Sequence, residues 1–240
     1  MNIALIFAGG SGKRLLPTGK PKQFLELYGK PIIIFTLEIF QHHPEIDKIV
    51  IPCITGWQDY LEELVEKYNI TKVEKILDGG KDTQESKINA LDYLNSFCSD
   101  NDIIMLHDAV RPLITKKLIS DNIDSVKKYG SAISYVPFNE TGIVSKDRKT
   151  TSETILRNTL FVAKAPQSFY FKDVYDAHLM GREMRPEITI DTCSLMVELG
   201  KSLHLVESDS TNIKITTPDD FFIFKALVDL KESKEIFGFQ

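Results

Sequence analysis

The sequence predicts an α/β fold: a mostly parallel twisted sheet with helices on both faces. Three observations predict it. Short apolar runs alternate with segments of helical periodicity from residue 3 to residue 136. Glycine-rich or acidic loops follow several apolar runs, where ligands sit on such sheets. The composition, 42% hydrophobic and 26% charged, is that of an ordinary globular protein.

The alternation gives strands and helices in turn. Strands are predicted at 3–7, 49–54, 73–77, 103–106 and 133–136. Helices are predicted from Pro31 to Phe40, around Leu61–Tyr68, after Asp82 with Glu85 in capping-box spacing, and up to Gly130. Each helix follows one strand and precedes the next, as crossover units of a parallel sheet require.

Residues 138–165 break this alternation. They are polar and lack a helical period, so we predict a protruding β-arm at about 138–165. Helices return at about 172–184 and 190–199, a strand is expected at 212–216, and a capped helix follows Thr217-Pro218-Asp219-Asp220. Nothing in the composition divides the chain, so residues 1–240 are predicted to form a single domain.

Charge and composition exclude several classes of partner. The net charge of −5 argues against a nucleic-acid or anionic-membrane surface. The three cysteines, Cys53, Cys98 and Cys193, are scattered and suggest no disulfide framework. No signal peptide and no apolar stretch of membrane-spanning length is apparent. We therefore expect a cytoplasmic protein with no nucleic-acid or membrane partner.

The loop after the first strand has phosphate-binding character. Small residues at 8–12 allow backbone N–H groups to converge on anionic oxygens, and Arg14, Lys20 and Lys22 add cations. A P-loop is excluded by Phe7 and Arg14, and a dinucleotide fingerprint by Leu15 in place of its last glycine. On these residues alone, a surface turn with solvated lysines remains the alternative.

Six blocks in order resemble the polyol-phosphate cytidylyltransferases, the methylerythritol-phosphate cytidylyltransferases and their ribitol-phosphate relatives. The blocks are AGGSGKR with PKQF, Gly79-Gly80 through Ser86, HDAVRP at 107–112, Arg157 in LRNTLF, APQSF at 165–169 and NIKIT at 212–216. Any one block is weak, but together they span nearly the whole chain. The resemblance implies a Rossmann-like nucleotidyltransferase that transfers CMP from CTP to a polyol phosphate and releases pyrophosphate.

The resemblance also implies residue roles. Arg14, Lys22 and Lys214 are the implied catalytic cations, which neutralise charge on the α-phosphate and pyrophosphate. The implied nucleotide-binding residues are Ala8, Gly9, Gly10, Ser11, Gly12, Gly80, Lys81, Ser86, Asp108 and Ala109. The implied acceptor-binding residues are Arg111, Thr141, Arg157 and Asp191. Asp108 is also the implied ligand of Mg²⁺, the expected cofactor.

Two further expectations concern the arm and His107. In the family the arm crosses into a second subunit and completes its site, which implies a homodimer. His107 is expected to be structural, because an acceptor phosphate that is already anionic needs no general base.

The sequence departs from the family pattern at the acceptor end. Thr83 stands where the family has arginine, Glu140 where it has aspartate, and Ala165 where it has threonine. Changed polar groups alter discrimination between hydroxylated substrates. These departures favour ribitol 5-phosphate, or a similar acceptor used for surface polymers, over 2-C-methyl-D-erythritol 4-phosphate.

Other classes fit the residues less well. Sugar-1-phosphate nucleotidylyltransferases have a longer interval than Arg14 to Lys22 and lack HDAVRP. A non-enzymatic nucleotide sensor would be expected to lose Arg14, Lys22 or Lys214, and all three are present. A dehydrogenase would require the dinucleotide fingerprint that is excluded above.

Overall fold

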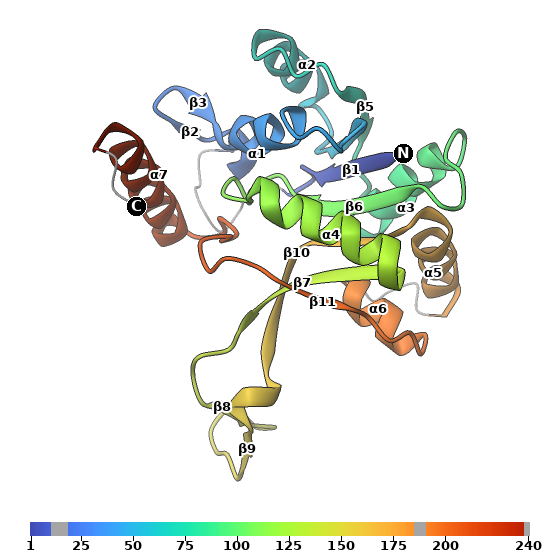
Figure 1. The fold of residues 1–240 in the computed structure, drawn as a ribbon, viewed down its shortest axis with the longest axis vertical. Helices are drawn as coiled ribbons and strands as arrows, with labels where there is room; N and C mark the ends of the chain where they lie inside the picture. The colour runs from blue at the N-terminus through green and yellow to red at the C-terminus, as the bar shows by residue number, and fades with distance from the viewer. Residues whose placement is uncertain (11–18, 185–190, 238–240) are drawn as a thin grey trace.

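The computed structural model describes residues 1–10, 19–184 and 191–237 (Figure 1). Within this part of the chain, a seven-stranded sheet has the order β11-β7-β10-β6-β1-β4-β5. Its strands are β1 Asn2–Phe7, β4 Lys48–Cys53, β5 Val73–Asp78, β6 Ile103–Asp108, β7 Ser131–Pro137, β10 Phe161–Tyr170 and β11 Leu205–Glu207. Strand β10 runs antiparallel to both neighbours, and the other pairs are parallel. This confirms the predicted mostly parallel sheet.

Helices cover both faces of the sheet, as predicted. One face carries α1 Ile32–Gln41, α2 Gln58–Lys67 and α4 Lys116–Tyr129, and the other carries α3 Thr83–Leu94, α5 Phe171–Met184 and α6 Thr192–Glu198. The central strands are buried on both sides: Ala4 and Ile6 of β1 face the first layer, while Ile3 and Leu5 face the second. Burial of these two apolar layers is the main source of stability.

Local sequence signals set the helix boundaries. The Asp82 carboxylate accepts a hydrogen bond of 2.9 Å from the Glu85 N–H, which caps α3 as predicted. Gly130 ends α4 with φ 81°, a left-handed conformation that favours glycine. Helix α1 begins directly after Pro31, one residue later than predicted.

Three small elements and the last helix complete the body. Residues Lys22–Phe24 form the short 3₁₀ helix η1, and β2 Glu26–Leu27 pairs with β3 Lys30–Pro31. Helix α7, Pro218–Phe237, packs through Phe224 and Val228 on a separate apolar cluster with Ile32. None of the described helices is both long and apolar enough to cross a bilayer.

The sheet reverses its strand order between β1 and β6. From β1 the chain adds β4 and β5 on one side, then returns to place β6 on the other. The register pairs Phe7 with Asp108, so both strands end at one edge. In open α/β sheets such a switch point opens a crevice for ligands.

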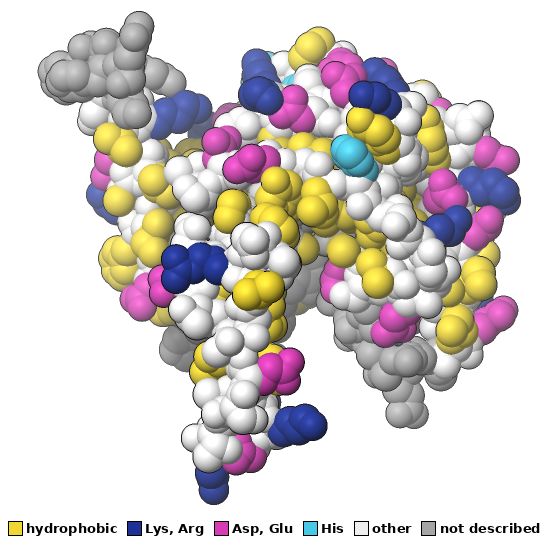
Figure 2. Space-filling view, turned by 60° about the horizontal axis from the view of Figure 1, so that its bottom comes forward, with side chains coloured by type: hydrophobic (Ala, Val, Ile, Leu, Met, Phe, Trp, Pro, Cys, Tyr) yellow, Lys and Arg dark blue, Asp and Glu magenta, His cyan; other side chains and the backbone are white. Residues whose placement is uncertain are grey.

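The predicted arm is present. It contains β8 Gly142–Val144, β9 Glu153–Ile155 and the 3₁₀ helix η2 Arg157–Thr159, connected to the body by β7 and β10. Figures 1 and 2 show it protruding from the body. The second half of β10, after residue 166, belongs to the central sheet and was not predicted as a strand. Pro166 and a register shift between Ala163 and Gln167 mask the strand pattern there.

The predicted strand at 212–216 is wrong. This segment crosses the carboxyl edge of the sheet, where the Ile215 N–H donates to the Val110 oxygen at 2.9 Å. Side chains hold the rest of it: Arg111 Nη1 donates to the Asn212 oxygen at 3.0 Å, and Asn212 Nδ2 donates to the Ala165 oxygen at 2.7 Å. An apolar alternating pattern therefore reports burial here without strand pairing.

Candidate active site

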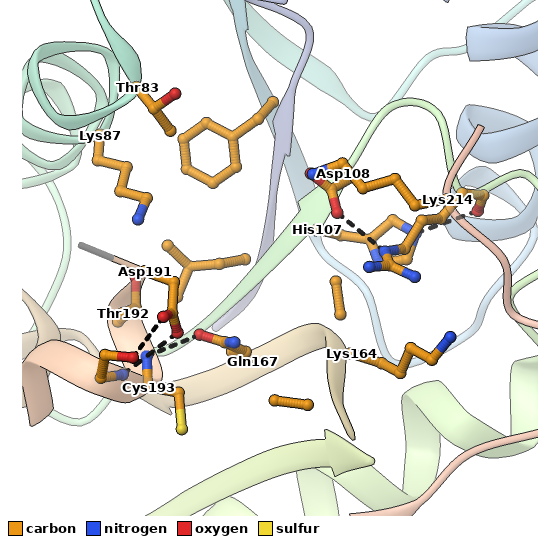
Figure 3. Close-up of a pocket in the computed structure, with 16 residues that line it drawn as sticks. Thr83, Lys87, His107, Asp108, Lys164, Gln167, Asp191, Thr192, Cys193 and Lys214 are labelled. Atoms are coloured by element: carbon orange, nitrogen blue, oxygen red, sulfur yellow. Dashed lines mark hydrogen bonds and ion pairs between the residues drawn. The ribbon is translucent and has the colours of Figure 1, made fainter. Parts of the chain in front are cut away.

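Two adjoining cavities open beyond the carboxyl ends of β1 and β6. The glycine-loop cavity, about 310 Å³, is lined by Gly9, Gly10, Lys22, Gly80, Lys81 and Ser86 among others. The lysine cavity, about 500 Å³, is lined by Lys87, Arg111, Lys164, Gln167 and Asp191 among others (Figure 3). Four residues line both: Phe7, Thr83, Asp108 and Lys214. The site is thus one crevice with two compartments that meet at Asp108 and Lys214.

Two of the three predicted catalytic cations come together at this crevice. Lys22 Nζ donates a hydrogen bond of 3.0 Å to the backbone oxygen of Ile215, the residue next to Lys214. Lys22 and Lys214 both line the glycine-loop cavity, although 191 residues lie between them in the sequence. Arg14, with Ser11 and Gly12, lies outside the described residues.

Asp108 is held between two cations at the boundary of the compartments. Lys214 Nζ lies 2.6 Å from Oδ1, and Arg111 Nε lies 2.8 Å from Oδ2. Burial alone would raise the pKa of Asp108, but the charges of Lys214 and then Arg111 have the larger combined effect. They hold the pKa of this carboxyl well below its usual range. The carboxylate is therefore ionised at neutral pH.

His107 supports the loop after β6. Its Nε2 donates to the Arg111 oxygen at 3.2 Å, because a carbonyl can only accept. His107 is 1% exposed, and burial lowers its pKa to about 4. The imidazole is therefore neutral and directed at backbone, which fits the predicted structural role.

The GGKD loop is shaped by Ser86. The Ser86 hydroxyl accepts from the Gly80 N–H at 2.9 Å and donates to the Asp82 oxygen at 2.8 Å. A Cβ on Gly80 would lie 2.4 Å from Glu85 Cβ, so this close approach requires glycine. Ser86 thus fixes the loop that lines the glycine-loop cavity.

Two predicted nucleotide-binding residues lie behind the cavity wall. The Ala8 N–H donates to Pro52, and its oxygen accepts from Ile54 and from Gln23 Nε2. The Ala109 N–H donates to Phe7, and its oxygen accepts from Thr36 Oγ1. These backbone groups support Gly9, Gly10 and Asp108, and neither alanine lines a described cavity.

Sequence reasoning missed Lys87 and Lys164. Lys87 is only 7% exposed; burial lowers its pKa to about 8, against smaller raising effects of Asp191 and Asp108. One signal could have found it, since Lys87 falls at helical spacing with Leu91 and Leu94 on the buried face of α3. Lys164, on β10, carried no such signal.

The predicted acceptor residues divide into two groups. Arg111 and Asp191 line the lysine cavity, and the Asp191 carboxylate also caps α6 by accepting from the Ser194 N–H at 3.2 Å. Thr141 and Arg157 are exposed on the arm and line neither described cavity.

One known protein family matches this chain over nearly its whole length. Residues 2–229 match the family described as IspD, 2-C-methyl-D-erythritol 4-phosphate cytidylyltransferase. The chain belongs to this family. The cytidylyltransferase family transfers a cytidylyl group from CTP, so the protein is a CTP-dependent nucleotidyltransferase that acts on a sugar-alcohol phosphate.

Individual relatives of this cytidylyltransferase refine the comparison. The "Ribitol-5-phosphate cytidylyltransferase" of Vibrio parahaemolyticus is 46% identical over 238 residues, 99% of this chain and 100% of the relative. The protein of the same name from Streptococcus agalactiae is 44% identical over 99% of both chains. A solved 4-diphosphocytidyl-2C-methyl-D-erythritol synthase from Anaerococcus prevotii superposes with TM-score 0.81 at 22% identity, covering 95% and 96% of the chains. That structure establishes the shared fold.

Proposed function

We propose that the protein transfers CMP from CTP to ribitol 5-phosphate, giving CDP-ribitol and pyrophosphate. The observation that carries the chemistry is the meeting of two cation-lined compartments at Asp108 and Lys214. One compartment suits a nucleotide and the other a phosphorylated acceptor. The choice of ribitol 5-phosphate is supported by the names of the two full-length relatives.

In this proposal the acceptor phosphate attacks the α-phosphorus of CTP in line. An oxygen–phosphorus bond forms, and the bond from the α-phosphorus to the pyrophosphate oxygen breaks. Lys22, Lys214 and Arg14 would neutralise the charge that repels the two anions and the charge that develops on the leaving group. The acceptor oxygen is already anionic, so the step needs no general base.

Asp108 fits the expected Mg²⁺. Its carboxylate is ionised and lies at the boundary of the two compartments, where the α-phosphate of CTP would face the acceptor. Among the described residues no group of three or more His, Cys, Asp or Glu side chains could hold a metal, so phosphate oxygens and water would supply the other ligands. When bound, the ion would offset negative charge on the triphosphate.

We also propose that the arm forms a homodimer. It exposes apolar side chains that a partner could cover, at Ile143, Ile155, Leu156, Phe161 and Val162. Thr141 and Arg157 on this arm would then reach the acceptor compartment of the partner protomer. The enzyme would act in the cytoplasm. Its CDP-ribitol product would supply surface-polymer synthesis, and this second proposal rests on the identity of the acceptor.

A substrate panel tests the proposed function. Pyrophosphate release is measured with CTP or UTP and with ribitol 5-phosphate, 2-C-methyl-D-erythritol 4-phosphate, glycerol 3-phosphate or glucose 1-phosphate. We expect kcat/KM for ribitol 5-phosphate to exceed that for methylerythritol phosphate by about 100-fold or more, because hydroxyl-reading sites discriminate strongly. A preference for methylerythritol phosphate, or for UTP with glucose 1-phosphate, would contradict the proposal.

A further inference from the structure

The lysine cavity contains charges that phosphoryl transfer does not use. Its described lining includes four basic side chains and two carboxylates: Lys87, Arg111, Lys164, Lys214, Asp108 and Asp191. Lys214, Arg111 and Asp108 form the ion pairs at the boundary with the glycine-loop cavity. In Figure 3, Lys87 and Asp191 lie at the other end of the cavity.

Lys87 lines the lysine cavity, the proposed acceptor compartment, and does not line the glycine-loop cavity. Its neighbours Thr83 and Ser86 line the glycine-loop cavity, but Lys87 lines only the lysine cavity. It is 7% exposed and projects from the buried face of α3. Burying an ammonium group is costly, and a leucine would pack more favourably at this position. A ligand that enters this compartment would give the charge a function.

Lys87 on α3 and Asp191 at the start of α6 lie on elements that contact one another through His178. Asp191 caps α6, and the next residue, Thr192, contacts His178 Nε2 through its hydroxyl at 3.1 Å. His178 Nδ1 lies 3.4 Å from Gln84 Nε2, on the helix that carries Lys87. His178 thus connects α3 with α6 across α5, which fixes the two sides of this end of the cavity.

We propose that Lys87 and Asp191 bind hydroxyl groups of the acceptor's polyol chain, at the end away from its phosphate. This inference rests on the proposed function, because the phosphate must then lie at Asp108 and Lys214. A hydroxyl group both donates and accepts. An ammonium group and a carboxylate together satisfy both capacities, and their opposite charges suit a neutral chain.

Steady-state kinetics of Lys87→Met test this inference. We expect the KM for ribitol 5-phosphate to rise about tenfold or more, because an unsatisfied hydroxyl is costly. The KM for CTP should stay within about twofold. The competitive inhibition constant of glycerol 3-phosphate, which keeps the phosphate but lacks the outer two carbons, should also stay within about twofold. The control is Lys75→Met, at an exposed position on β5.

A second variant guards against misfolding. Asp191→Asn keeps a side chain that can cap α6 and removes only the charge, so it should fold and should also raise the ribitol 5-phosphate KM. An unchanged KM in both variants would overturn the inference, and so would equal losses for ribitol 5-phosphate and glycerol 3-phosphate. Wild-type protein that does not use ribitol 5-phosphate would refute the proposed function and this inference with it.

Discussion

Asp108 is the residue on which the geometry of the crevice depends. It ends β6, faces Phe7 across the register with β1, and binds Lys214 and Arg111. These two cations come from the loop after β6 and from the segment before α7. One ionised carboxylate therefore connects the end of β6 and the loop after it to the segment before α7, at the switch point of the sheet.

Replacing this carboxylate should affect both stability and turnover. Asp108→Asn leaves Lys214 and Arg111 without their counter-charge, so we expect a loss of roughly 1 to 3 kcal/mol in the free energy of unfolding. Turnover should fall about 100-fold or more. Urea unfolding and initial rates of pyrophosphate release check these values. Unchanged stability would show that the ion pairs do not hold the segments together.

Lys22 offers a test with a smaller structural effect. Lys22→Ala removes a cation and one hydrogen bond to the Ile215 oxygen. We expect kcat/KM to fall by about 100-fold to 1000-fold, while thermal unfolding shifts by only a few degrees. The matched control is Lys117→Ala, at a lysine on α4 whose side chain is 82% exposed. Near-normal turnover of the Lys22 variant would remove it from the catalytic group.

Motifs placed several predicted residues at the two cavities, including Arg111 in the lysine cavity, but they did not outline the rest of that cavity. Gly80, Ser86, Asp108 and Lys214 lie in short sequence blocks whose spacing carries the signal. The lysine cavity forms where α3, β10 and the start of α6 meet, and no local pattern encodes that meeting. Lys164 was missed for this reason, whereas Lys87 was missed although its helical spacing with Leu91 and Leu94 placed it on the buried face of α3.

At the scale of elements, the exposed apolar side chains of the arm lead us to expect a dimer. Leu156 is 73% exposed in the single chain, so Leu156→Glu should leave the fold of the protomer intact while disrupting an apolar interface. We expect light scattering to give twice the chain mass of 27.3 kDa for the wild type and a single mass for the variant. A wild-type protein with the single mass would contradict the dimer.

Mixing two inactive variants tests whether the arm acts across the dimer. A heterodimer of Lys22→Ala with Arg157→Ala keeps one intact site, if Arg157 serves the partner protomer. Random exchange would then restore about one quarter of wild-type turnover, because half the dimers carry one active site of two. Activity that stays at the level of the separate variants would place Arg157 in its own protomer's site, or outside the site.

Sequence patterns predicted the crossover units well and the antiparallel part of the sheet poorly. Alternating apolar strands and amphipathic helices, with caps at Asp82 and Gly130, determine the secondary structure of the first half of the chain. Strand β10 was missed, and the segment 212–216 was wrongly predicted as a strand. Both depend on pairing between distant segments, which local periodicity does not report.

At the scale of the whole molecule, stability should depend on buried histidines. Burial between α3, α5 and α6 and, to a smaller extent, the nearby charge of Lys87 lower the pKa of His178 to about 3. In the unfolded chain the imidazole of His178 is protonated with its ordinary pKa of about 6.5. Between these values the unfolded state binds more protons, so the free energy of unfolding falls as the pH decreases, by up to about 1.4 kcal/mol per unit.

Substitution isolates this contribution. His178→Gln should reduce the fall in unfolding free energy between pH 6.5 and about 4, measured by urea unfolding at several pH values. Most carboxylates titrate below about pH 5, so the part of the window above pH 5 reports mainly the histidines. His204→Gln, at an exposed position, is the control. If both variants show the wild-type slope, burial of His178 does not cost the protein stability in acid.

A crystal structure of the protein with bound CTP tests the central claim most directly. We predict that the cytosine and the triphosphate occupy the glycine-loop cavity, with the α-phosphate between Lys22 and Lys214. A triphosphate bound in the lysine cavity, or one that contacts neither lysine, would contradict the assignment of the two compartments.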